Sequence, residues 1–153
     1  MGKETLASTA DRKVILGRLG KMRPDSPRQW GKMNAHQAVC HLCDSFRGVM
    51  GDRTLSGKPF PLGGVIKWVA LYAPMKWSRN LPTMPEVDQM KLGTPPVEFA
   101  GDVGELDRLV ERFSGSPREF TWRPHPFFGE MNERDWMRWG WLHMDHHFRQ
   151  FGI

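Results

Sequence analysis

The stretch "NERDWMRWGWLHMDHHFRQFG", which begins at Asn132, constrains the fold most, because a helix there must bury histidines. On a helical wheel of about 100° per residue, the apolar face centred on Trp136 also carries four small or polar residues: Gly140, His143, His147 and Gln150. The charged residues of this stretch fall on the opposite side. The pattern therefore predicts a long helix with two imidazoles on its buried face, one turn apart.

Two buried imidazoles need partners, because each brings a donor and an acceptor into an apolar interior. The spacing of His143 and His147 places both rings on one side of the helix, close enough to share an ion. His146 falls to one side of this face, near Trp139. The spacing alone leaves two interpretations open, a metal site and a pair of hydrogen-bonded core histidines.

His41 is the strongest candidate for a third ligand. It lies at the edge of the apolar stripe of a second predicted helix, about 100° from Leu42. The alternative for His41 is a helix-edge histidine bonded to solvent or to a neighbour. His36, in the first turn of the same helix, and His125, in the loop "RPHPFFG", are weaker candidates.

The motif "CHLC" also supplies metal-ligand types, at Cys40 and Cys43. About a hundred residues separate it from the histidine pair, far more than a zinc finger allows. The motif falls in mid-helix, whereas a thioredoxin-type motif lies where a strand meets a helix. We interpret both cysteines as packing residues.

Five segments have helical periodicity or caps, and none alternates as a strand would. The predicted helices run from Ser8 towards Pro24, from Asn34 to Gly51, from Gly63 to about Tyr72, from a cap at Asp102 with Glu105 to Gly115, and from Asn132 to Phe151. The apolar stripes expected to face the core are Val14, Ile15, Leu19 and Met22 in the first helix, Val65, Trp68, Val69 and Tyr72 in the third, and Leu106, Leu109, Val110 and Phe113 in the fourth.

The proline-rich region between the third and fourth helices has little periodicity. A loop of this length inside a compact domain is usually functional. We predict that residues 81–92 cover the mouth of the histidine site, with Trp77 and Met84 among its lining residues. The whole pattern predicts an all-α fold, a four-helix bundle with one additional short helix and a long irregular loop, as a single domain over residues 1–153.

Composition excludes several classes of protein. The 153 residues are 39% hydrophobic and 25% charged, which suits one globular core. The net charge is +5, but the basic residues are interspersed with acidic ones and no nucleic-acid motif appears, so we expect no nucleic-acid partner. No apolar run is long enough to span a membrane, and we see no signal peptide and no disulfide framework. We therefore expect a cytoplasmic protein without a membrane partner.

Three stretches resemble the DinB-like superfamily of metal-binding four-helix bundles, and within it a bacterial branch of unassigned function. They are "WGKMNAHQAVCHLCDSF", "LPTMPE" and "HPFFGEMNERDWMRWGWLHMDHHFRQFG", which with their spacing span most of the chain. The superfamily often carries the pattern H-x-x-H-H-x-x-Q, which here falls on His143, His146, His147 and Gln150.

The resemblance implies a divalent metal ion held by three histidines, one from the second helix and two from the last. Carried over position by position, these are His41, His143 and His147, the same three that the helical wheels favour. His146 is then a neighbour of the site. Characterised relatives include transferases that use low-molecular-weight thiols and a mycothiol-dependent isomerase.

Three neutral imidazoles would leave a coordination position open, as in catalytic zinc sites. Imidazole suits several metals; we favour zinc, with nickel and iron as alternatives. The residues that we expect around the ligands or in the pocket are Gln37, Ser45, Gln150, His146 and Trp136. Gln37 has an alternative role, as the capping partner of Asn34.

Three hypotheses follow for the function. The first is a metal-dependent enzyme acting on a small-molecule substrate, resembling a thiol-dependent S-transferase or a hydrolase, with a low-molecular-weight thiol as a candidate cosubstrate. The second is a non-catalytic metal-dependent binding or stress-response module. The third is a structural bundle whose histidines only form hydrogen bonds in the core. A homodimer is compatible with each of them.

Overall fold

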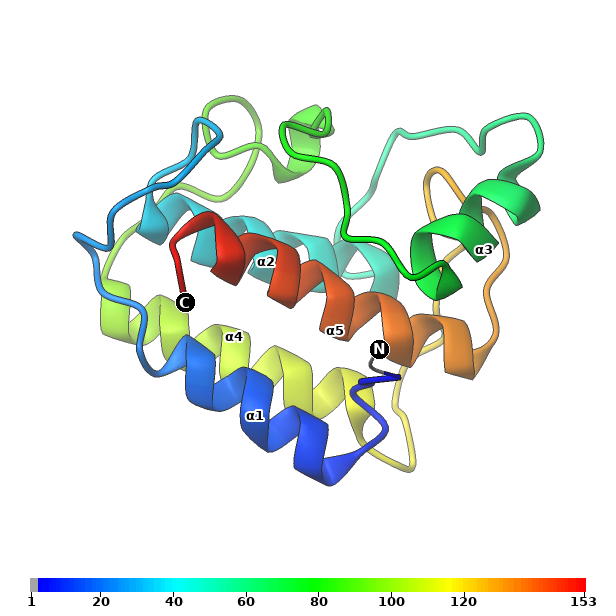
Figure 1. The fold of residues 1–153 in the computed structure, drawn as a ribbon, viewed down its shortest axis with the longest axis horizontal. Coiled ribbons are helices and arrows are strands. Elements are labelled where there is room, and N and C mark those ends of the chain that lie inside the picture. The colour runs from blue at the N-terminus through cyan, green and yellow to red at the C-terminus, as the bar shows by residue number, and fades with distance from the viewer. Residues whose placement is uncertain (1–2) are drawn as a thin grey trace.

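The computed structural model describes residues 3–153, and this part of the chain is built from helices (Figure 1). They are α1 (Thr9–Leu19), α2 (Ala35–Met50), α3 (Gly63–Tyr72), α4 (Phe99–Ser114) and α5 (Glu133–Gln150), with a short 3-10 turn, η1 (Pro85–Val87). Over the described residues the only extended pairing is an isolated bridge between His125 and Gly129. The predicted all-α bundle of four main helices, one short helix and a long loop is confirmed.

The four long helices lie side by side, with α1 and α5 running one way and α2 and α4 the other (Figure 1). The main packing contacts join α2 to α4, α1 to α5 and α2 to α5. Because α2 and α4 are parallel, the chain must cross the length of the bundle between them. That crossing comprises α3 and residues 73–98, and it passes over α2 and α5. The topology therefore accounts for the long irregular loop.

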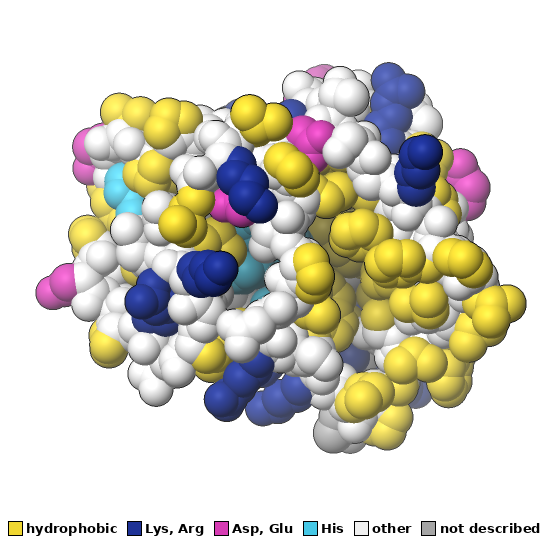
Figure 2. Space-filling model, turned by 90° about the horizontal axis from the view of Figure 1, so that it is seen from above, with side chains coloured by type: hydrophobic (Ala, Val, Ile, Leu, Met, Phe, Trp, Pro, Cys, Tyr) yellow, Lys and Arg dark blue, Asp and Glu magenta, His cyan; other side chains and the backbone are white. Residues whose placement is uncertain are grey.

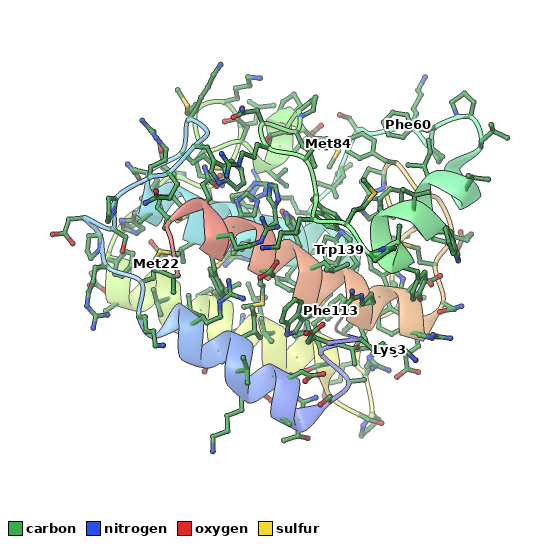
Figure 3. The ribbon with its side chains drawn as sticks, viewed as in Figure 1. Lys3, Met22, Phe60, Met84, Phe113 and Trp139 are labelled. Atoms are coloured by element: carbon green, nitrogen blue, oxygen red, sulfur yellow. The ribbon has the colours of Figure 1, made fainter. Side chains whose placement is uncertain are left out.

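The core contains large aromatic side chains between the helices. Phe113 lies between α4 and α5 (Figure 3), and its ring meets those of Phe46, Trp136 and Trp139 at centroid distances of 5.0, 6.3 and 6.1 Å. Burying rings of this size in edge-to-face and tilted arrangements is a major source of stability. The rigid core fixes α2 and α5 relative to each other.

Three helix starts match the prediction, because each has the predicted polar cap. The Ser8 hydroxyl accepts from the Asp11 N–H, and Asn34 and Asn132 form capping boxes with Gln37 and Asp135. Gly51, at φ +90°, ends α2 in the left-handed conformation that a side chain would disfavour. These local signals place the start of α1 and α5 and both ends of α2.

The predicted start of α4 was wrong. The helix begins at Phe99, because the Glu98 carboxylate accepts from the N–H groups of Ala100 and Gly101 and so caps it earlier. Asp102 therefore lies in the first turn of the helix. The helix ends at Ser114, and Gly115, where the predicted helix ended, follows it in an extended conformation. A glutamate at the cap is not among the preferred capping residues, which is why the sequence pattern missed it.

The predicted apolar faces of α1 and α3 also need correction. Val14 is 59% exposed, and only Ile15 and Leu19 of α1 are buried. In α3 only Leu71 is buried. The apolar residues exposed on or beside this helix are Phe60, Leu62, Val65, Ile66, Trp68 and Val69, and Figure 2 shows hydrophobic side chains gathered on that part of the surface. The periodicity identified a helix, but α3 lies at one end of the bundle, where little of the molecule can cover it.

Within residues 3–153, no helix has both the length and the apolar character needed to cross a bilayer.

Candidate metal centre

The three predicted ligand histidines meet between α2 and α5. One ring nitrogen from each of His41, His143 and His147 lies within 4.8 Å of the other two. The Nε2 atoms of His41 and His143 are 3.2 Å apart. His41 and His147 are almost completely buried.

A backbone carbonyl fixes the orientation of the His41 ring. Its Nδ1 lies 2.6 Å from the carbonyl oxygen of Val87, in η1. A carbonyl only accepts hydrogen bonds, so Nδ1 carries the proton and donates it. Nε2 is then left with a bare lone pair directed at the other histidines. The crossing loop thus determines which His41 nitrogen is available to a metal.

Gln150 does the same for His147. Its Oε1 accepts from Nδ1 of His147 at 3.0 Å, while its Nε2 donates to the Trp30 carbonyl at 3.0 Å. The second bond fixes the amide orientation, because only the NH₂ group can donate to a carbonyl. Gly31, at φ +84°, makes room for this contact, since a Cβ there would lie 2.4 Å from Nε2 of Gln150. His147 therefore also presents an unprotonated Nε2 to the cluster.

His143 contributes Nε2 from the side of Trp139 and Trp77, whose ring centroids lie 5.0 and 5.8 Å from its own. Its Nδ1 is buried and has no hydrogen-bond partner within residues 3–153. If Nε2 of His143 donated to His41, Nδ1 would be a buried acceptor without a donor. If Nδ1 carried the proton, two bare Nε2 atoms would face each other at 3.2 Å. Hydrogen bonds within the protein therefore do not satisfy this ring.

The electrostatics of the cluster favour neutral rings. Burial lowers the pKa of His41, and burial together with the neighbouring imidazoles holds the pKa of His143 and of His147 well below the ordinary value. Neutral imidazole is the form that ligates metals. At neutral pH no proton has to be displaced from these three rings before they bind a cation.

The residues present fit a divalent ion. Two nitrogens bound tetrahedrally at about 2.0–2.1 Å are roughly 3.3 Å apart, close to the 3.2 Å between the Nε2 atoms of His41 and His143. Two of the three rings are oriented by hydrogen bonds from Nδ1, the arrangement typical of metal-ligating histidines. His41, His143 and His147 therefore lie close enough together to hold a metal ion.

Aromatic side chains enclose the cluster. His146 lies outside the ligand group, with its ring centroid 5.1 Å from that of His147, 4.8 Å from Trp30 and 5.8 Å from Trp77. Burial lowers its pKa to about 4. Figure 2 shows histidine side chains in a hollow of this face, with Lys and Arg side chains beside them. The predicted role of His146 as a neighbour of the ligands agrees with this position.

The other predicted pocket residues take different roles. Gln37 accepts from the Asn34 N–H in the capping box and is not directed at the cluster. The Ser45 hydroxyl donates to the His41 carbonyl at 2.8 Å, so it contacts the ligand residue through its backbone. Trp136 packs in the core against Phe113 and other rings, and its ring contacts do not include the three ligand histidines. Of the predicted surrounding residues, Gln150 alone bonds a ligand ring directly.

The two weaker histidine candidates lie elsewhere. His125 Nδ1 accepts from the N–H groups of Phe127 and Phe128, and burial lowers its pKa to about 3. His36 faces Asp102 on α4. Neither belongs to the group formed by His41, His143 and His147.

Sequence reasoning missed the residue that anchors the loop over the site. Asp44, on α2, is completely buried, and its carboxylate accepts from Thr94 and Gln89 of the loop and from Arg53. Arg53 in turn donates to the carbonyls of Glu86 and Leu92. The sequence did contain a signal for Asp44: it follows His41 by three residues, so on a helix it lies one turn further along, on nearly the same face as His41. The predicted position of residues 81–92 over the site is confirmed, because this network holds Val87 against His41.

Fold and site together define a class, an all-α bundle with a buried group of three histidines shared between α2 and α5. A family model described as "Protein of unknown function (DUF1569)" matches residues 27–152, and the chain belongs to this family. The match includes α2 to α5 and all three histidines. No curated protein and no solved structure matches the chain.

Proposed function

We propose that this protein binds a divalent metal ion through His41, His143 and His147 and uses it to act on a small-molecule substrate. The observation that carries the proposal is the paired orientation of two rings. Val87 and Gln150 each accept a hydrogen bond from Nδ1 of one of these histidines, and the unprotonated Nε2 atoms of both rings are left to face the same point. Histidines that only formed hydrogen bonds in the core would also need a partner for the third ring, but Nδ1 of His143 has none within residues 3–153.

We further propose kinship with the DinB-like metal-binding bundles. The arrangement of one ligand on α2 and two on α5, four residues apart, supports it. On this basis we favour zinc, with nickel and iron as alternatives.

The chemistry of three neutral imidazole ligands suits catalysis. Such a site leaves the ion its full charge and an open position, where it can lower the pKa of water to about 7 or hold a thiol as thiolate. The enclosing rings of Trp30, Trp77 and Trp139 limit the access of water and offer apolar contacts to a substrate.

We favour a thiol-dependent S-transferase-like or a hydrolase-like reaction. The alternative is a non-catalytic metal-dependent binding module. Zinc-loaded protein assayed for thiol transfer and for ester or amide hydrolysis separates the two, with His41→Ala as the inactive reference. Turnover above that reference supports the enzyme, and ligand binding without turnover supports the module.

Metal binding itself is tested by stripping the protein with a chelator, adding zinc, and counting bound ions by elemental analysis and calorimetry. We expect His41→Ala and His147→Ala each to bind one zinc ion per chain fewer than the wild type. His146→Ala, a change of the same residue type on the same helix, should lose none. Wild-type protein that takes up no zinc, or a His41→Ala variant that binds as much as the wild type, would overturn the proposal.

A further inference from the structure

A second group of metal-ligating side chains lies on the other side of α2, facing α4. Nε2 of His36 is 2.6 Å from Oδ2 of Asp102, and Sγ of Cys40 is 3.6 Å from the same oxygen. One ligand atom from each of the three residues lies within 4.8 Å of the other two. The group uses none of the histidines of the first site.

We propose that His36, Cys40 and Asp102 form a second metal site, for zinc or a similar thiophilic divalent ion, which ties α2 to α4. The proposal goes beyond the function given above and does not depend on it. It also changes the interpretation of Cys40 as a packing residue that the sequence suggested.

The spacing of the ligands supports the site. His36 and Cys40 are four residues apart on α2, so their side chains stack on one face of the helix. With tetrahedral bonds of about 2.3 Å to sulfur and 2.1 Å to oxygen, sulfur and oxygen lie roughly 3.6 Å apart. The observed distance between Sγ of Cys40 and Oδ2 of Asp102 is 3.6 Å. The contact between His36 and Asp102 must widen, from 2.6 Å to about 3.3 Å.

The surroundings hold the ligands in place. The N–H of Val97, just before α4, donates to Oδ2 of Asp102 at 3.2 Å. The Phe99 ring packs edge-on to the His36 ring with centroids 5.3 Å apart. Cys40 is buried, while His36 and Asp102 are partly exposed, so solvent can supply the remaining coordination position. A ligand set of thiolate, imidazole and carboxylate selects zinc-like ions over magnesium or calcium.

Binding there exchanges a proton for the ion. Without metal, the Cys40 thiol donates a hydrogen bond to Oδ2 of Asp102 at 3.6 Å, so Sγ carries a proton. A bound cation takes the place of that proton, which is released to solvent, and Sγ becomes the thiolate ligand. The hydrogen-bonded group is thus already arranged around the point where the ion would lie.

Cobalt(II) distinguishes this site from the histidine site. Thiolate coordinated to cobalt(II) gives a charge-transfer absorption in the near ultraviolet, which three imidazoles cannot give. We expect metal-stripped wild-type protein to develop this band on titration with cobalt(II), and zinc to abolish it by displacement. Cys40→Ser should remove the band, and His36→Ala should weaken cobalt binding at the site by at least about tenfold.

The chain supplies two matched controls. Cys43 lies one turn from Cys40, but its thiol donates to the backbone carbonyl of Asp102, so Cys43→Ser should keep the band. His41→Ala removes a ligand of the first site and should also keep it, which separates failure of this proposal from failure of the proposed function. A folded wild-type protein without the band, or a band that survives Cys40→Ser and disappears with Cys43→Ser, would overturn the second site. The partly exposed His36 provides an independent test if Cys40→Ser does not fold.

Discussion

Substituting Asp44 by asparagine tests whether the buried carboxylate holds the loop over the histidine site. Oδ1 of Asp44 accepts from Arg47, Arg53 and the Thr94 hydroxyl, at 3.3, 3.4 and 2.7 Å. Oδ2 accepts from Gln89 at 2.9 Å and from the Thr94 N–H at 2.7 Å. All five partners are donors, so the site suits a carboxylate and not an amide.

The size of the effect follows from these bonds. Asparagine replaces one oxygen by an NH₂ group, and at least two donors then lose their acceptor and face another donor. Hydrogen bonds to a charged group contribute about 1.5–3 kcal/mol each, so the free energy of unfolding should fall by about 3–6 kcal/mol. For a chain of this size that corresponds to a decrease in Tm of about 6–24 °C.

Thermal and urea denaturation measure this loss, and trypsin reports on the loop. Lys91, whose side chain is 58% exposed, should be cleaved faster in Asp44→Asn because the loop is less firmly held. Asp52→Asn is the control, since Asp52 forms an exposed ion pair with Arg112 and should cost less than about 1 kcal/mol. Equal stability losses in the two variants, with unchanged cleavage at Lys91, would refute the anchoring role of Asp44.

Three other results are expected. In a Cys40→Ser background, where only the histidine site remains, zinc at a hundred times its Kd should stabilise the protein by about 2.7 kcal/mol. Adding His147→Ala should abolish this gain in Tm and adding His146→Ala should retain it, and an equal gain in both variants would contradict the assignment. In the metal-free protein, the pKa of His125 is about 3 against 6.5 for an ordinary histidine, so the unfolded chain takes up the proton first. The contribution of His125 to the free energy of unfolding is complete above pH 6.5 and is lost as the pH falls towards 3, by about 1.4 kcal/mol per pH unit. Denaturation at several pH values between 7 and 4 should therefore show that the free energy of unfolding falls less steeply with decreasing pH in His125→Gln than in the wild type. An identical dependence on pH in the two proteins would contradict this role of His125. Gly140→Ala should cost about 1–3 kcal/mol, because its Cβ would lie 2.5 Å from Leu6. Gly104→Ala, with nothing within 4 Å, should instead gain about 0.5–1 kcal/mol, and the opposite order of Tm values would exclude the packing argument.

The sequence by itself determined the helical class, most helix ends and the ligand candidates. Capping residues act within one turn of the chain, so Asn34 and Asn132 could be recognised without tertiary information. The position of His143 and His147 on the buried side of α5 follows from helical periodicity alone. The prediction that they lie beside His41 assumed that the buried face of this helix packs against the buried face of the helix that carries His41, and the family resemblance supported that assumption.

The tertiary structure decided what lies around and between the helices. The exposure of Val65 and Trp68 depends on the end position of α3, which periodicity does not encode. The Val87 carbonyl carries no sequence signal for its bond to His41, since every residue has a carbonyl. His36 and Cys40 gain a ligand partner only because α2 packs against α4 and brings Asp102, some sixty residues further along the chain, to the same point. Local rules fixed the buried faces of α2 and α5, and long-range packing fixed which side chains meet.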